Sequence, residues 1–173
     1  MSKEKLIKGN NEFIDSISNN QMLKELNIDL VENGQRPYAL VITCSDSRVI
    51  PELIFNKTIG ELFVIRTAGN VINDGELATI EYAIEHLKIK TIIVLGHTHC
   101  GAIHAAINMG SGKYINKILN IIKDNINGEK DETKAAIINA EKVKNYILDK
   151  FPEYDGEILS ALFDIRKSTV TYN

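Results

Sequence analysis

The sequence predicts an α/β fold with a parallel-core β-sheet flanked by helices. Three short apolar runs, at 38–43, 61–67 and 91–95, have the composition of strands buried on both faces. Segments with helical periodicity lie between and after these runs, and this alternation is typical of a parallel sheet. A length of 173 residues suits one domain. We therefore expect a single domain over 1–173, with an N-terminal helical arm over about 1–30.

The helices follow from apolar periodicity and from capping residues. Residues 3–18 carry apolar side chains at helical spacing, and Asn33-Gly34 marks a turn after the arm. Asn73 or Asp74 can cap a helix that runs to Leu87. The remaining expected elements are helices over 102–109, 114–126 and 132–150 and a terminal strand pair at 157–165 and 169–172.

Composition and charge limit the classes of function. Lys plus Arg is 20 and Asp plus Glu is 23, so the basic excess of a nucleic-acid-binding protein is missing. No apolar run approaches the ~20 residues that span a bilayer, and the segment 1–5 lacks the apolar stretch of a signal peptide. We expect a cytoplasmic protein with no nucleic-acid or membrane partner. In a reducing compartment its two cysteines are ligands or catalytic groups rather than a disulfide.

Two loops at the carboxyl ends of predicted strands carry the residues that are the strongest candidates for metal ligands or catalytic groups. Cys44 follows the first strand, and His97 and Cys100 follow the third. Ligands of open parallel sheets bind beyond the carboxyl ends of the strands, so these loops can converge on one site. Two thiolates and an imidazole suit Zn²⁺, and three protein ligands leave the fourth position of a catalytic site for water. Spacing alone leaves His99 and His104 as rival ligands, and it leaves open ordinary buried thiols and solvated imidazoles.

Asp46 and Arg48 lie in the same loop as Cys44. An arginine–carboxylate pair is a strong, oriented interaction. It could hold Asp46 as the acceptor for a zinc-bound hydroxide, whereas a freed Asp46 could bind zinc and block the site. An ordinary loop salt bridge is the third interpretation. A papain-like pair of cysteine and histidine also stays open, although it leaves the second cysteine without a role.

Three motifs together resemble those of the β-class carbonic anhydrases. They are Cys44-Ser45-Asp46-Ser47-Arg48, Arg66-Thr67-Ala68-Gly69-Asn70 and Gly96-His97-Thr98-His99-Cys100-Gly101. Glu81-Tyr82-Ala83 fits the same pattern, and the resemblance runs from about Gln35 to Ile107. The order and spacing of the motifs make the combination specific.

The resemblance implies a ligand set, a reaction and an assembly. One Zn²⁺ per chain would be held by Cys44, His97 and Cys100, with Asp46 and Arg48 as the catalytic dyad. The implied substrate-binding residues are Gln35, Val49, Phe63, Ala68, Tyr82 and Gly101. The implied reaction is the reversible hydration of CO₂ to bicarbonate and a proton by zinc-bound hydroxide, in a homodimer or a higher homo-oligomer. The same motifs would also serve a zinc hydrolase of CS₂ or COS, or a non-catalytic zinc-binding protein.

Overall fold

The chain forms two compact units, Met1–Arg36 and Pro37–Asn173. The structure is a computed structural model that describes residues 2–108 and 110–173. The first unit holds α1 (Ser2–Asn19) and α2 (Gln21–Asn33), in the region where the helical arm is expected. The Asn20 side chain caps α2, and Gly34 follows its end with a φ of 77°. The grouping of both units into one domain over 1–173 stays a prediction.

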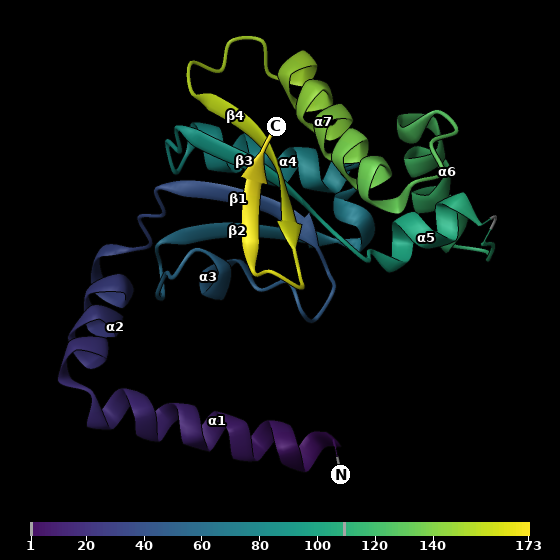
Figure 1. The fold of residues 1–173 in the computed structure, drawn as a ribbon. Helices are drawn as coiled ribbons and strands as arrows, with labels where there is room; N and C mark the ends of the chain where they lie inside the picture. Colours follow the sequence, from purple (N-terminus) through teal and green to yellow (C-terminus); the bar gives the residue numbers. More distant parts are fainter. Residues whose placement is uncertain (1, 109) are drawn as a thin grey trace. The chain divides into compact units, whose positions relative to one another are not determined.

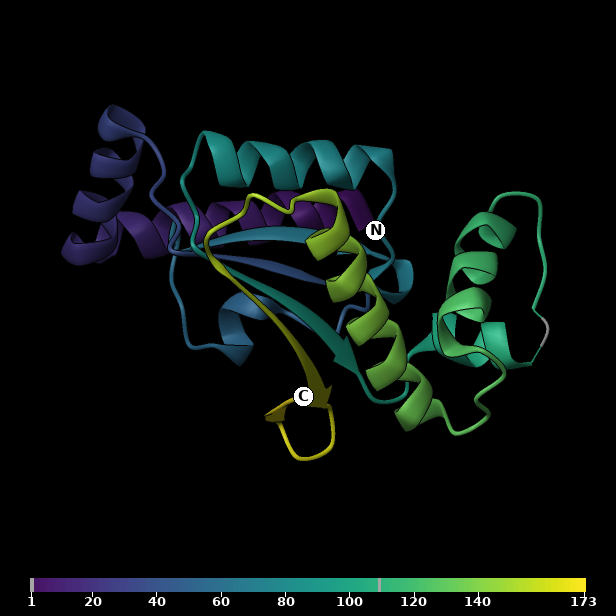
Figure 2. The ribbon, with the colours of Figure 1, turned by 90° about the horizontal axis from the view of Figure 1, so that it is seen from above.

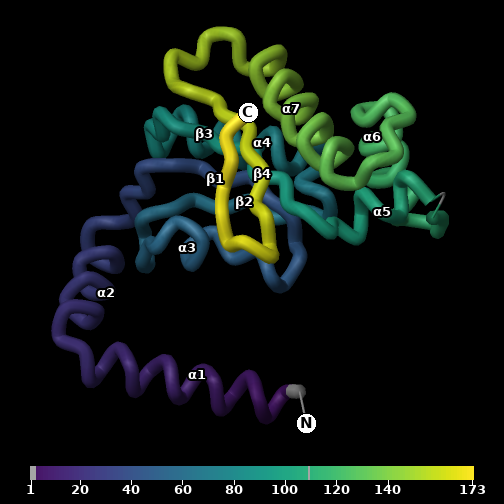
Figure 3. The backbone as a smooth tube through the Cα atoms, viewed as in Figure 1, coloured from purple at the N-terminus to yellow at the C-terminus, as the bar shows by residue number. Residues whose placement is uncertain are grey.

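The second unit is built on a five-stranded sheet with the order β2-β1-β3-β4-β5 (Figure 1). The strands are β1 (Ala39–Cys44), β2 (Leu62–Thr67), β3 (Thr91–His97), β4 (Glu157–Asp164) and β5 (Thr169–Tyr172). The first four pair in parallel, and β5 turns back antiparallel to β4, as the backbone tube in Figure 3 shows. The predicted fold class, a parallel-core sheet flanked by helices, is confirmed.

Six helical segments accompany the sheet in the described residues of the second unit. They are α3 (Pro51–Ile54), the 3₁₀ turn η1 (Ala68–Asn70), α4 (Asp74–Glu85), α5 (Gly101–Ile107), α6 (Ile115–Ile126) and α7 (Glu132–Lys150). Asn73 caps α4 in a reciprocal capping box with Glu76, as its position in the sequence predicts. The predicted helix over 102–109 corresponds to α5, and Met109 lies outside the described residues. Within the described part of the chain, no helix has both the length and the apolar character needed to cross a membrane.

The helices cover the sheet unequally. α4 and α7 pack on one face, against apolar side chains of β1, β2 and β3. The other face is covered by α3 and by Val170 of β5. α5 and α6 lie beyond the carboxyl ends of β1 and β3 (Figure 2), where they close a third apolar cluster that includes Cys44 and Cys100. The sheet thereby brings its loops to one edge and surrounds that edge with helices.

Candidate metal centre

Cys44, His97 and Cys100 meet at the carboxyl edge of the sheet. Cys44 ends β1, His97 ends β3, and Cys100 directly precedes α5. Because β1 and β3 are parallel neighbours, their last residues reach the same edge. All three side chains are buried, and their potential ligand atoms lie within 4.8 Å of one another. The convergence expected from the strand order is therefore present.

The donor atoms fit a tetrahedral zinc ion. The two Sγ atoms are 3.9 Å apart, close to the ~3.8 Å that two Zn–S bonds of about 2.3 Å would give at a tetrahedral angle. Nδ1 of His97 lies 2.9 Å from the Thr98 carbonyl oxygen, to which it can donate. Nε2 of His97 is buried and has no hydrogen-bond partner among the residues that the structure describes. A backbone acceptor at one ring nitrogen typically orients a histidine whose other nitrogen binds metal.

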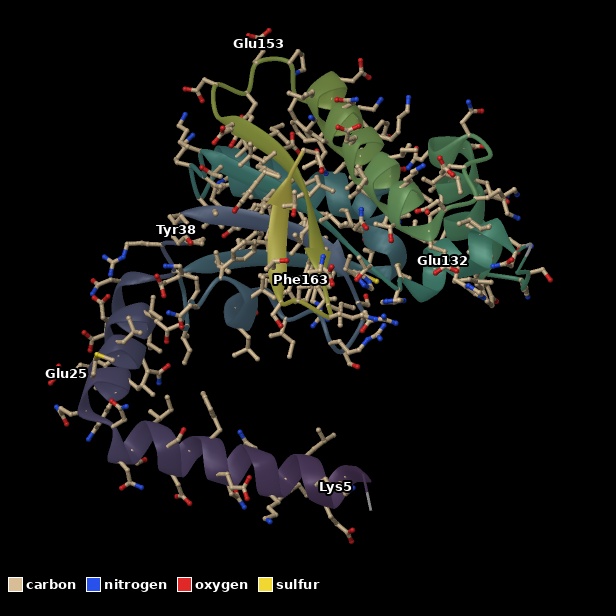
Figure 4. All side chains as sticks on the ribbon, in the orientation of Figure 1. Lys5, Glu25, Tyr38, Glu132, Glu153 and Phe163 are labelled. Carbon is tan, nitrogen blue, oxygen red and sulfur yellow. The ribbon has the colours of Figure 1, made fainter. Side chains whose placement is uncertain are left out.

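The two rival histidines lie outside this cluster. His99 is exposed and has a left-handed backbone, with a φ of 56°. His104 is exposed on α5, and its Nδ1 donates to the Glu132 carboxylate at 2.6 Å. Glu132 is labelled in Figure 4, at the end of α7 that faces α5. The backbone thus separates His97 from both alternatives, which spacing alone could not do.

The pKa values of the two cysteine thiols are shifted in opposite directions. The pKa of Cys44 is lowered, mainly by its hydrogen bond with Cys100 and further by the backbone N–H groups of Gly69 and Asp46. The pKa of Cys100 is raised, because its hydrogen is held by Cys44 and because burial disfavours a second thiolate. A divalent cation would compensate both thiolates, so the pair favours metal binding over two isolated thiols.

Arg48 donates hydrogen bonds to both carboxylate oxygens of Asp46. Its Nε donates to Oδ1 at 2.9 Å and its Nη2 to Oδ2 at 2.7 Å. The hydrogen bond from Arg48 is the main reason that the pKa of Asp46 lies well below its usual range. Arg48 also donates to the His99 carbonyl oxygen at 3.2 Å, which ties the Asp46 loop to the loop of the other two cluster residues. Among the described residues, the cluster of Cys44, His97 and Cys100 includes no carboxylate.

Arg66 was predicted only as part of a motif, without a role of its own, and it is a structural residue of this edge. Arg66 lies on β2, directly before its last residue, Thr67. Its side chain donates to the carbonyl oxygens of Cys44, at 3.2 Å, and of Asp46, at 2.6 Å. These bonds fix the backbone of the loop that carries both residues. The available signal was an arginine at the end of a predicted strand, where an apolar side chain would be usual.

Four of the predicted pocket residues differ from one another in burial and in their place in the fold. Gln35 is exposed and belongs to the first unit. Val49 is fully buried in the apolar cluster on the α3 face of the sheet. Ala68 is half-buried in η1, and Gly101 is exposed at the start of α5. Their substrate-binding roles stay predictions.

Phe63 and Tyr82 pack on each other, away from the metal cluster of the same chain. Their ring centroids are 6.1 Å apart. The strand register places Phe63 opposite Leu40, which precedes Cys44 by about 13 Å at ~3.3 Å per residue. Within one chain, the register therefore keeps Phe63 at a distance from the cluster.

Gly69 is expected to tolerate no side chain. Its φ is 67°, and a Cβ there would come within 2.7 Å of Ile122 Cδ1 and 3.1 Å of Ala102 Cβ. Left-handed strain of ~1–2 kcal/mol and overpacking of ~1–3 kcal/mol should both act in Gly69→Ala. We expect this variant to lose about 2–5 kcal/mol of unfolding free energy in urea titrations.

Gly128→Ala is the matched control for Gly69→Ala. Gly128 also has a positive φ, of 84°, but no atom of the described part of the chain lies within 4 Å of its added Cβ. It should therefore lose only the backbone term of ~1–2 kcal/mol. Equal losses in the two variants would contradict the close packing of Gly69 against α5 and α6.

The fold and the cluster define an α/β protein in which three buried side chains could hold a metal ion. Residues 39–151 match the family model described as carbonic anhydrase. The chain belongs to this family, in its β class.

Curated relatives agree with this membership. A carbonic anhydrase of Synechocystis sp. is 38% identical over 135 residues, which cover 75% of this chain and 44% of that protein. Carbonic anhydrase 2 of Mycobacterium tuberculosis is 46% identical over 91 residues, which cover 50% of this chain and 44% of that protein. The matched region thus spans less than half of the length of these relatives.

Solved structures share the fold over nearly the whole chain. The β-carbonic anhydrase CcaA has a TM-score of 0.81 and 30% sequence identity, with 99% of this chain and 95% of that chain covered. The β-carbonic anhydrase CafA of Aspergillus fumigatus has a TM-score of 0.88 and 23% identity, with coverages of 100% and 91%. The second likeness concerns the fold alone.

Proposed function

We propose that this chain catalyses the reversible hydration of CO₂ to bicarbonate and a proton, with one Zn²⁺ held by Cys44, His97 and Cys100. The observation that supports this most strongly is the unpartnered, buried Nε2 of His97 beside two thiols whose spacing suits zinc. Zinc in such a site acidifies the water that it binds, so that hydroxide is available near neutral pH.

Asp46 and Arg48 would supply the orientation that the reaction needs. Arg48 keeps Asp46 ionised and holds its carboxylate away from the metal ligands. The carboxylate would then serve as a fixed hydrogen-bond acceptor beside the metal site, where it would orient the attacking group relative to CO₂. The bonds from Arg66 to the Cys44 and Asp46 carbonyl oxygens hold a ligand and the acceptor in a fixed relation.

A stopped-flow hydration assay with zinc analysis tests the proposal. The purified full chain should contain about one zinc per chain and accelerate CO₂ hydration between pH 7 and 9. Removal of the metal by a chelator should abolish the activity, and added Zn²⁺ should restore it. One zinc per chain without hydration would refute the proposal and favour a non-catalytic zinc protein. Turnover of CS₂ or COS alone would favour the hydrolase.

We further propose that the chain works as a homodimer or a higher homo-oligomer in the cytoplasm. The first unit exposes Leu6, Ile7, Phe13 and Ile14, and clustered exposed apolar side chains often mark an interface. The strand register separates Phe63 from the metal cluster of its own chain, so a pocket role for this side chain would involve the cluster of a second copy. The pocket roles of Phe63 and Tyr82 therefore depend on the proposed assembly. CO₂ or bicarbonate would bind at the carboxyl edge of each sheet.

A further inference from the structure

Asn139 is a buried amide on an otherwise apolar helix face. It lies on α7 and is 0% exposed. Its buried neighbours on the helix are Ala135, Ala136, Ala140, Val143 and Ile147. An amide without partners in such surroundings would be costly. A polar residue at this position therefore needs hydrogen bonds that repay its burial.

Both ends of the Asn139 amide are hydrogen-bonded. Nδ2 donates to the Gly69 carbonyl oxygen at 2.9 Å, and Oδ1 accepts from Asn125 Nδ2 on α6, also at 2.9 Å. A carbonyl oxygen can only accept, so Gly69 dictates which end of the amide faces it. The bond from Asn125 then fits the remaining oxygen. The orientation of Asn139 is thereby fixed from both sides.

Gly69 connects this amide to the metal cluster. Its N–H donates to Cys44 Sγ at 3.3 Å, while its carbonyl oxygen accepts from Asn139. Its φ of 67° is the left-handed conformation that relates these two groups. A continuous series of hydrogen bonds thus runs from Asn125 through Asn139 and Gly69 to the sulfur of Cys44.

We propose that Asn139 is a positioning residue of the metal centre, which holds Gly69 so that its N–H donates to the Cys44 thiolate. The inference rests on the metal site of the proposed function. A hydrogen bond to a ligating sulfur withdraws electron density from it and orients it. Asn139 would therefore affect both how tightly the centre binds zinc and how strongly the Cys44 sulfur donates to the metal, although Asn139 touches neither.

Substitution of Asn139 should change the metal centre in two measurable ways. Asn139→Leu keeps the approximate volume and removes both hydrogen bonds, and Asn139→Asp keeps an acceptor for Asn125 but cannot donate to Gly69 when ionised. In competition with a chelator, each variant should bind zinc about 10-fold or more weakly than wild type, as is usual when an outer partner of a ligand is lost. With Co²⁺ as the probe, the sulfur-to-metal charge-transfer band should move to longer wavelength, because a sulfur without its donor is oxidised more easily.

Val143→Ala is the matched control. Val143 lies one helical turn further along the same buried face, and truncation there creates a core cavity without touching Gly69. It should lower the thermal midpoint and leave the Co²⁺ band in place. If Asn139→Leu and Asn139→Asp lower only the thermal midpoint, as this control does, the positioning role is wrong.

The outcomes separate this inference from the proposed function. A wild-type chain that binds neither Zn²⁺ nor Co²⁺ would refute the metal site itself. A wild-type chain with a normal Co²⁺ band that is unchanged in the Asn139 variants would refute only the positioning role. If Asn139→Leu yields no folded protein, the band and affinity of Asn139→Asp decide the question.

Discussion

Replacement of Cys100 with serine is expected to remove the metal and, with it, the hydration activity. A serine hydroxyl stays protonated at neutral pH and is a poor zinc ligand, whereas zinc binding requires the deprotonated sulfur. Cys100 is buried, and its Sγ lies 3.9 Å from that of Cys44, so no solvent-exposed group can take its place easily. We expect zinc content to fall from about one per chain to below about a tenth, with CO₂ hydration at the uncatalysed rate.

His99→Asn is the control for Cys100→Ser. His99 lies in the same loop, but it is exposed and its φ of 56° is one that asparagine adopts well. Its carbonyl oxygen, which accepts from Arg48, is unchanged by the substitution. This variant should keep its zinc and most of its activity. Loss of zinc in His99→Asn together with retention in Cys100→Ser would exchange the two assignments and refute the ligand set.

The main strands were predictable because strands that are buried on both faces appear in the sequence as continuous apolar runs. Ala39–Cys44 and Thr91–His97 are almost wholly buried, and strands buried on both faces must be continuously apolar. The short segments were not predicted. α3 has four residues, too few to show a period, and it begins with Pro51 at its first turn. η1 depends on the positive φ of Gly69. Glycine adopts positive and negative φ about equally well, so its presence in the sequence does not predict this turn.

The convergence of Cys44 with His97 and Cys100 was predictable from topology alone, since parallel neighbours end at one edge. The choice of His97 over His99 was not derivable from spacing, because it depends on the left-handed turn at His99. Asn139 was not predicted as a functional residue, since its partner Gly69 is distant in the sequence. Its signal was an asparagine on the apolar stripe of a predicted helix, where only a compensated polar group is stable.

Conversion of Asp46 to asparagine is expected to remove activity while leaving zinc bound. The amide keeps the shape of the side chain but loses the charge that Arg48 pairs with and weakens the acceptor. Loss of a positioned proton acceptor typically costs about 10²–10⁴-fold in rate. Zinc analysis and stopped-flow hydration on the same sample should show an unchanged metal content and a rate reduced by that factor. Arg48 lowers the pKa of Asp46, so this carboxylate stays ionised at every pH above the usual pKa range of an aspartate. Over that pH range, protonation of Asp46 should not reduce the hydration rate of the wild-type chain.

Asp155→Asn is the matched control for the loss of an aspartate charge. Asp155 pairs with Lys90, which directly precedes β3 and so lies at the opposite end of that strand from His97. Its removal should leave both zinc content and hydration rate near those of wild type, because exposed ion pairs contribute little. Arg48→Ala should resemble Asp46→Asn in rate, since the carboxylate is then free to turn toward the metal and occupy the position that water needs. Full activity in Asp46→Asn would remove the carboxylate from the proposed reaction, whereas the proposed metal ligands Cys44, His97 and Cys100 would be unaffected by that result.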